Sequence, residues 1–259
     1  MIAAESRRKE VFRMETICNF KRIEKKYLLS EKQYQDLFSC IGSHLKPDEY
    51  GQSTIMSLYL DTPDHRIIRN SIEAADYKEK LRLRSYGTAA SDSTVFLELK
   101  KKNKGIVYKR RTAMTLLQAN SYLYRRAKPF ESQIMSEIDW AMKLYRWPKP
   151  TMLIACEREA WFDDEHPDLR LTFDRDIRYR ETDLAFKRAN AGISLLPKNT
   201  VLLEVKTAGA MPLWLADAFD KGDILPCSFS KYGTAYTQSQ EEKQIISMLK
   251  GGNKSVVNF

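Results

Sequence analysis

The sequence lacks the cysteine and histidine patterns that mark zinc sites, disulfide frameworks and many hydrolases. Its four cysteines, Cys18, Cys40, Cys156 and Cys227, are scattered, and none forms a CxxC pair. This distribution predicts free thiols in a reducing cytoplasm. The three histidines lie in polar, loop-like contexts, without an HExxH motif or a nucleophile–base pattern. These absences argue against zinc-dependent and histidine-dependent catalysis.

Long apolar runs are also missing. No segment approaches the roughly 20 apolar residues that a helix needs to cross a bilayer. The first residues are polar and lack the apolar region of a signal peptide. We therefore expect no membrane insertion by this chain and a cytoplasmic location. Its 259 residues suit one large domain or two small ones.

Acidic residues are too few to balance the basic ones. The chain has 43 Lys and Arg against 34 Asp and Glu, which gives a formal net charge of +9. This excess points toward an anionic partner, such as nucleic acid, an anionic membrane or phosphorylated small molecules. Charge alone does not choose between these partners, and a merely basic protein would show the same balance.

Segments in which polar and apolar residues alternate dominate the chain. Strands are predicted at 19–27, 53–61, 77–86, 94–101, 106–114, 152–162, 169–175 and 200–207. Helices are predicted at 31–41, 63–73, 115–127, 131–145, 212–221 and 231–249. Helices inserted irregularly among strands indicate an α+β fold with an antiparallel sheet. Eight strands is also a number at which a sheet can close into a barrel.

Charged residues recur at alternate positions on most of these strands, opposite apolar residues. The segment 77–86 places four cations on one face, namely Lys78, Lys80, Arg82 and Arg84. The wet face of a half-exposed sheet is the ordinary explanation for such a pattern. A wet face, however, would mix Thr, Ser and Gln with both signs of charge. Here Arg and Lys dominate, so the ordinary explanation is insufficient for the whole set.

Three strands carry the pattern Glu-x-Lys, as Glu24 with Lys26, Glu98 with Lys100, and Glu204 with Lys206. If the sheet closes, the apolar faces must point outward beneath helices, and the charged faces then line the interior. A dry lumen of unpaired cations would be prohibitively costly. The pattern therefore predicts a water-filled tunnel that holds a polyanion. Carboxylates among phosphates are best explained by a divalent metal that bridges both.

These strands, together with YLDT at 59–62, LELK at 97–100 and FSKY at 229–232, resemble the triphosphate tunnel metalloenzymes, the CYTH-like superfamily. Within it the sequence is most similar to the VTC domain, the catalytic domain of polyphosphate polymerases. The resemblance implies an eight-stranded antiparallel β-tunnel, a closed barrel with a charged lumen, decorated by helices. We expect this domain at residues 18–249, between an N-terminal extension at 1–17 and a flexible tail at 250–259.

The resemblance also implies roles for individual residues. The cations implied to act in catalysis are Lys26, Arg82, Arg84, Lys100, Arg158 and Lys206. The resemblance implies that Lys109, Arg111, Arg170 and Lys231 bind substrate, the last near a tunnel mouth. We also expect Lys78 and Lys80 of the cationic row to bind substrate. Glu204 would be the principal ligand of Mn²⁺ or Mg²⁺, with Glu24 and Glu98 as its partners.

Two positions depart from the patterns of relatives. Arg22 stands where cyclase and triphosphatase relatives often carry the first glutamate of E-x-E-x-K. This favours VTC-like members and weakens a two-metal site. Ser228 stands where we would expect a lysine in eukaryotic polymerases, which removes one contact to the chain. We also expect any translocation of polyphosphate to involve a membrane or export partner protein.

The predicted function is a metal-dependent transfer of the ATP γ-phosphate to a growing polyphosphate chain, with orthophosphate as a starter. If water attacks instead, the same tunnel is a triphosphatase. A protein that binds polyphosphate without turnover is a further alternative. Nucleic-acid binding is disfavoured, because the aromatic residues mostly fall off the cationic positions. A membrane-surface role would require a basic amphipathic helix, whereas the basic residues concentrate on strands.

Overall fold

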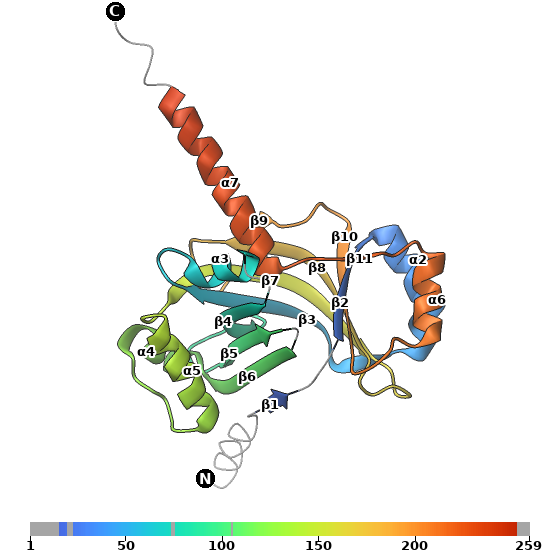
Figure 1. Cartoon of the computed structure of the whole chain (residues 1–259), viewed down its shortest axis with the longest axis horizontal. Helices are drawn as coiled ribbons and strands as arrows, with labels where there is room; N and C mark the ends of the chain where they lie inside the picture. Colours follow the sequence, from blue (N-terminus) through green and yellow to red (C-terminus); the bar gives the residue numbers. More distant parts are fainter. Residues whose placement is uncertain (1–15, 20–22, 74–75, 105, 253–259) are drawn as a thin grey trace, which may run out of the picture.

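The computed structural model describes residues 16–19, 23–73, 76–104 and 106–252 (Figure 1). The strands are β1 (Thr16–Asn19), β2 (Ile23–Ser30), β3 (Lys46–Asp61), β4 (Tyr77–Tyr86), β5 (Thr94–Asn103), β6 (Ile106–Thr115), β7 (Lys149–Phe162), β8 (Arg170–Arg180), β9 (Ile193–Ser194), β10 (Thr200–Thr207) and β11 (Pro226–Cys227). The helices are α2 (Glu31–Ile41), the short 3₁₀ helix η1 (Gly42–His44), α3 (Arg66–Glu73), α4 (Leu116–Arg125), α5 (Gln133–Leu144), α6 (Leu213–Lys221) and α7 (Lys231–Gly252).

One antiparallel sheet holds all of these strands. The long strands lie side by side in the order β6-β5-β4-β3-β7-β8-β10-β2, and the short strands β1, β11 and β9 pair with β6, β2 and β8. Each predicted strand and helix is present, and β4, β10 and α2 have the predicted bounds. The predicted mixture of helices and an antiparallel sheet is therefore confirmed.

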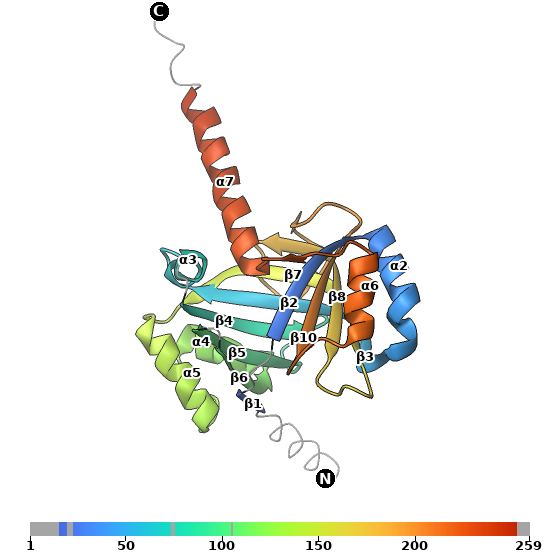
Figure 2. The same cartoon turned by 45° about the vertical axis from the view of Figure 1, so that its right-hand side comes forward.

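The predicted closed barrel is not confirmed. Within the described ranges, hydrogen bonds join neither β2 nor β11 to β1 or β6, so the sheet stays open although it curls strongly (Figure 2). The physical reason lies in the two edges that would have to meet. Strand β11 occupies the free edge of β2 at Tyr27 and Lys26, and β1 occupies the free edge of β6. Backbone groups that would close a barrel are thereby already paired.

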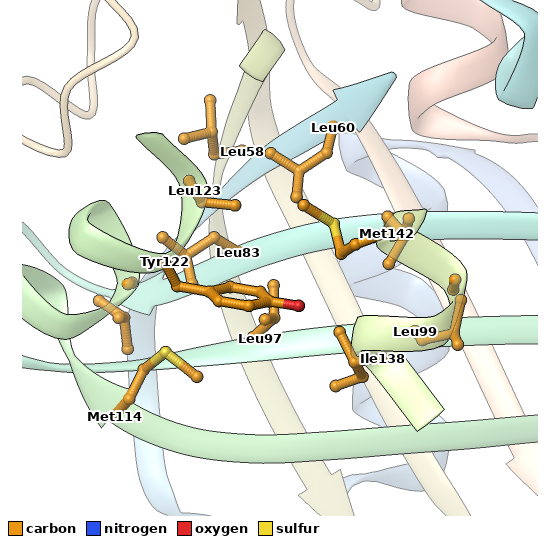
Figure 3. Close-up of a cluster of buried hydrophobic side chains, with 14 of the residues drawn as sticks. Leu58, Leu60, Leu83, Leu97, Leu99, Met114, Tyr122, Leu123, Ile138 and Met142 are labelled. Carbon is orange, nitrogen blue, oxygen red and sulfur yellow. The ribbon is translucent and has the colours of Figure 1, made fainter. Parts of the chain in front are cut away.

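The apolar faces of the strands point outward and lie beneath two helical layers, as the sequence predicts. In the first layer, Leu83, Leu97 and Leu99 of the sheet pack against Tyr122 of α4 and Ile138 of α5 (Figure 3). The second layer consists of α2 and α6, which cover β2, β8 and β10. Leu37 of α2 and Leu215 and Phe219 of α6 belong to the same buried cluster as Phe173 of β8 and Leu203 of β10. The polar side chains of the strands consequently point to the inner face.

Local signals explain how α2 begins. The Ser30 hydroxyl accepts a hydrogen bond from the backbone N–H of Gln33, and the Gln33 side chain accepts one from the backbone N–H of Ser30. This reciprocal cap satisfies donors that a helix N-terminus leaves unpaired. Ser30 and Gln33 thus form a capping box, and it ends β2 where the chain must turn back over the outer face.

Part of the inner face is apolar, which the sequence pattern did not predict. The first turns of α7 pack there through Tyr232 and Ala235, against residues such as Tyr59, Ile154 and Leu202. Beyond these turns α7 extends away from the sheet (Figures 1 and 2). The helix reaches Gly252, inside the segment predicted as a flexible tail, and residues 253–259 lie outside the described part. No helix among the described residues combines the length and the apolarity needed to span a bilayer.

Candidate functional site

Strand β4 presents the cationic row to the inner face. The side chains of Lys78, Lys80, Arg82 and Arg84 are half-buried there, whereas the intervening residues are buried beneath the outer layer. A direct consequence of the period of two is that one strand supplies both the core and the site. The predicted common face of these four cations is confirmed.

Glu98 on β5 is an internal counter-ion for this row. In the sheet register it lies between Arg82 on β4 and Arg111 on β6. Its carboxylate is 2.7 Å from Arg82 Nη2, 2.8 Å from Lys109 Nζ and 3.6 Å from Arg111 Nε, and its side chain is 1% exposed. Burial opposes ionisation, yet Arg82, Arg84 and Lys109 hold the pKa of Glu98 well below its usual range. The Glu98 carboxylate therefore already has three cationic partners within the protein.

Glu204 on β10 is the centre of a second cluster. Its carboxylate is 3.0 Å from Lys231 Nζ, 3.6 Å from Lys206 Nζ and 3.8 Å from both Lys26 Nζ and Arg158 Nη2. Burial again opposes ionisation, but these cations hold the pKa of Glu204 well below its usual range. Lys231, which the family resemblance places near a tunnel mouth, lies beside this carboxylate, and its side chain is largely buried.

Asp174 on β8 joins this cluster, although the sequence prediction did not include it in the site. Its side chain is 0% exposed. Arg158 Nε and Nη2 each donate to it at 2.6 Å, and Lys231 Nζ lies 2.5 Å from Oδ2. Burial would raise the pKa of Asp174, but Lys231 and Arg158 lower it. The sequence did carry a signal, because Asp174 alternates with Arg170 on the polar face of its strand.

Glu24 on β2 connects the two ends of the curled sheet. Its carboxylate is 3.4 Å from Lys26 Nζ and 3.3 Å from Lys100 Nζ on β5. Although burial and the charge of Glu204 raise its pKa, Lys100, Lys206 and Lys26 lower the pKa of Glu24 to about 2. An ion pair between side chains therefore links β2 and β5, which no backbone hydrogen bonds join in the described part of the chain.

Several neutral groups assist the cations. Arg84 Nε lies 3.4 Å from the Ser57 hydroxyl, and Arg82 Nη1 lies 3.4 Å from the Tyr59 hydroxyl. Among the described residues, no carboxylate lies within ion-pair distance of Arg84. Lys80 Nζ donates to the Ser230 hydroxyl at 2.8 Å. These partners were not predicted, because a neutral residue on a strand gives no charge signal.

Other predicted residues make further contacts or lie near strand ends. Lys26 Nζ also donates to the Phe229 carbonyl at 2.9 Å. Arg111 stacks 3.7 Å above the Phe96 ring. Lys78 is half-buried at the start of β4, and Arg170 is exposed opposite Lys206 in the register of β8 and β10. Arg22 lies outside the described residues.

A protein-family model, the VTC domain, matches residues 21–240 of the chain. The chain belongs to the VTC domain family. No curated protein matches it at a significant level. A candidate adenylate cyclase of known structure from Bacillus halodurans is 15% identical, with a TM-score of 0.51, over 81% of this chain and 93% of that one. A second, from Vibrio parahaemolyticus, is 10% identical with a TM-score of 0.46, over 85% and 99%. The first likeness concerns the fold alone.

Residues of two short motifs of this VTC domain have structural roles. Asp61 of YLDT accepts hydrogen bonds from the backbone N–H groups of Ile67 and Ile68, where α3 begins, at 2.9 and 3.0 Å. It also accepts one from the Tyr232 hydroxyl of FSKY at 3.0 Å. The rings of Tyr59 and Tyr232 stack with centroids 4.2 Å apart. The motifs thus fix the start of α7, and with it the position of Lys231.

The carboxylates differ in their suitability as metal ligands. Within the described ranges, no three Asp, Glu, His or Cys side chains gather as a protein-only metal site. Glu98 and Asp174 are inaccessible, whereas Glu24 is 27% and Glu204 is 11% exposed. Mg²⁺ in proteins commonly binds one or two carboxylates together with substrate phosphates. The donor set therefore fits a divalent ion that binds with a phosphate ligand, at Glu24 and Glu204.

Lys80 should make triphosphate binding depend on pH. Burial and the neighbouring cations Lys26, Lys100 and Arg82 lower its pKa to about 7. At pH 8 the amine of the empty lumen is therefore mostly uncharged, and a phosphate bound beside it would restore the proton. We expect tripolyphosphate binding at pH 8 to take up more protons in the wild type than in Lys80→Arg, whose guanidinium is always charged.

Calorimetry in two buffers of different ionisation enthalpy measures this difference. Because tripolyphosphate itself titrates equally in both experiments, subtracting the proton uptake of Lys80→Arg from that of the wild type leaves the proton uptake by Lys80. Equal proton uptake by the two proteins would show that Lys80 is already charged or lies away from the phosphate.

Proposed function

We propose that this VTC domain is a metal-dependent polyphosphate polymerase, which transfers the γ-phosphate of ATP to a growing polyphosphate chain in its lumen. The observation that carries the proposal is the excess of cations over carboxylates on one enclosed face. Among the described residues, the carboxylates that form ion pairs with these cations are Glu24, Glu98, Asp174 and Glu204. The remaining positive charge requires a polyanion. The family assignment supports a triphosphate-handling enzyme of the tunnel type.

The clusters around Glu98 and Glu204 would both contribute to binding of the triphosphate. Arg82, Arg84 and Lys109 lie together around Glu98, and Lys26, Lys206 and Lys231 surround Glu204. Guanidinium groups bind phosphate oxygens in a fixed fork, while lysine contributes a mobile charge. A triphosphate placed between the clusters would meet arginines on one side and lysines on the other. Since these groups are preformed, little reorganisation accompanies binding.

Phosphoryl transfer needs positioning and charge stabilisation more than covalent help from the protein. A terminal oxygen of polyphosphate, or of orthophosphate as starter, attacks the γ-phosphorus in line. The bond between the γ-phosphorus and the bridging oxygen breaks, ADP leaves with that electron pair, and the chain grows by one phosphate. Lys26, Arg158 and Lys231 orient the phosphates and offset the charge that develops.

A bound Mn²⁺ or Mg²⁺ would supply additional charge neutralisation, and Glu24 and Glu204 are the residues that would hold it. These two carboxylates are poor candidates for a general base, because their pKa values lie far below neutrality. The attacking terminal phosphate oxygen is already anionic. The proposed reaction therefore proceeds without a proton acceptor from the protein.

The deciding experiment incubates the purified protein with ATP and Mn²⁺, resolves the products on a polyphosphate gel and measures ADP and free phosphate. We expect a polyphosphate ladder with ADP in matching amount. Free phosphate without a ladder would identify water as the acceptor and make the protein a triphosphatase. Tight binding of ATP without either product would leave a polyphosphate-binding protein and overturn the polymerase.

A further inference from the structure

Asp174 differs from the other carboxylates of the site in being completely enclosed. It has no exposed surface, so neither a substrate phosphate nor a metal ion reaches its oxygens without displacing a side chain. Both oxygens are already used, by the Arg158 fork and by Lys231. A carboxylate in this position influences the reaction only through the cations that it holds.

The contact with Arg158 restricts what that arginine offers to a phosphate. A guanidinium has two edges that can form paired hydrogen bonds, and the Nε–Nη2 edge of Arg158 is bound to Asp174. The other edge, with both N–H groups of Nη1 and one of Nη2, is the part of Arg158 that remains for a phosphate. Arg158 Nη2 also lies 3.8 Å from Glu204. Its orientation is therefore set by two carboxylates, and their negative charges oppose the binding of a phosphate beside it.

The contact with Lys231 links two parts of the fold. Asp174 lies on β8 within the sheet, whereas Lys231 begins α7, the helix that enters the inner face from outside. Lys231 Nζ lies between Asp174 and Glu204, at 2.5 and 3.0 Å. Burial disfavours the ammonium, but these two carboxylates raise the pKa of Lys231 and keep it charged. Asp174 thus holds a cation of α7 against the site.

We propose that Asp174 is a positioning residue, which fixes Arg158 and Lys231 beside Glu204 and at the same time limits their affinity for phosphate. This inference rests on the proposed function. Its consequence is a separation of binding from turnover. Without the charge of Asp174, both cations are free to hold a phosphate more tightly, but they are no longer held where the reaction needs them.

Asp174→Asn tests this separation, because it keeps the size of the side chain and removes its charge. We expect tripolyphosphate to bind about threefold to tenfold more tightly without metal, since one negative charge near the phosphates is lost. We expect kcat with ATP to fall about tenfold to a hundredfold. The Mn²⁺ concentration that gives half-maximal activity should not change, because the enclosed Asp174 would not be a ligand of the metal.

A control variant and several contrary results distinguish a positioning role of Asp174 from other roles. Asp164→Asn removes the same charge from an exposed loop residue and should leave affinity and kcat unchanged. Unchanged kcat and affinity in Asp174→Asn, with a lower melting temperature alone, would reduce Asp174 to a structural role and overturn the proposal. An increased requirement for Mn²⁺ would overturn it in favour of a metal ligand, and weaker tripolyphosphate binding would also contradict it.

A second variant keeps the test available if Asp174→Asn does not fold. Asp174→Glu retains the counter-charge but moves it by one methylene, so we expect kcat to fall while tripolyphosphate affinity stays within about twofold. Full kcat in Asp174→Glu would contradict a positioning role. If the wild type itself shows no turnover, the proposed polymerase has failed, and the tripolyphosphate affinities of wild type and Asp174→Asn still decide whether Asp174 limits the hold on phosphate.

Discussion

Arg84→Ala should weaken tripolyphosphate binding by about 1.5–3 kcal/mol, roughly 10-fold to 150-fold, which is the usual contribution of hydrogen bonds to a charged group. Unlike most truncations inside a protein, it should leave the empty protein as stable as before or more so. Both expectations follow from the surroundings of Arg84. Burial and the neighbouring Arg82 lower its pKa, so the empty lumen disfavours the charged guanidinium.

The partners of Arg84 explain why its removal costs the fold little. Among the described residues its side chain has a long contact to the Ser57 hydroxyl, at 3.4 Å, and no carboxylate at ion-pair distance. Arg82, by contrast, is bound to Glu98 at 2.7 Å. Deleting Arg84 therefore relieves repulsion without leaving a buried carboxylate unpaired. The charged Arg84 therefore lowers the stability of the empty protein, and an anionic ligand would offset this cost.

Isothermal titration calorimetry with tripolyphosphate and thermal unfolding of the empty protein measure the two effects. Lys143→Ala is the matched control, because it removes a cation from the outer surface of α5, where the side chain is well exposed. It should change neither affinity nor the melting temperature appreciably. Equal tripolyphosphate affinity in Arg84→Ala and Lys143→Ala would mean that phosphate does not reach the β4 row.

The faces of the strands were predictable because alternation is a local property. In β4 every second residue carries charge, and the leucines between them need an apolar cover, so both the direction of the cations and the outer helices follow. Ser30 and Gln33 similarly define the start of α2 from four residues. Such signals depend on neighbours in sequence and do not require knowledge of the tertiary structure.

Closure of the sheet was not predictable in the same way. Whether β2 pairs with β6 depends on which other segments pair with their free edges, and the short strands β1 and β11 pair there. A strand as short as Pro226–Cys227 has no alternation to detect. The ion pair between Glu24 on β2 and Lys100 on β5 joins residues 76 positions apart, which a pattern within one strand does not reveal.

The roles of the individual carboxylates also depended on the tertiary structure. The pattern Glu-x-Lys is the same around Glu24, Glu98 and Glu204, and the family resemblance implied Glu204 as the principal metal ligand with the other two as its partners. Their burial separates them, because Glu98 is enclosed by Arg82, Lys109 and Arg111, whereas the side chains of Glu24 and Glu204 are 27% and 11% exposed. We therefore propose the metal at the two accessible carboxylates, with Glu98 as a counter-ion.

Glu204→Gln should reduce turnover of ATP by roughly a hundredfold or more, the scale on which loss of one charge-stabilising group acts in an active site. Tripolyphosphate binding without metal should stay equal or become tighter. The reason is that the amide no longer competes with phosphate for Lys231, Lys206 and Arg158, which now surround the carboxylate. Activity and metal-free binding should thus change in opposite directions.

Glu98→Gln is the informative companion, because it makes the same substitution at the enclosed carboxylate. There, three cations would lose their shared partner, and breaking such a buried arrangement typically costs about 3–5 kcal/mol of stability. We expect Glu98→Gln to lower the melting temperature without raising the Mn²⁺ concentration needed for half-maximal activity, and Glu204→Gln to raise that concentration. Unchanged turnover in Glu204→Gln would remove Glu204 from the metal site, and a raised Mn²⁺ requirement in Glu98→Gln would return Glu98 to it. The accessibility of a carboxylate, rather than its sequence motif, then decides which residues meet the metal.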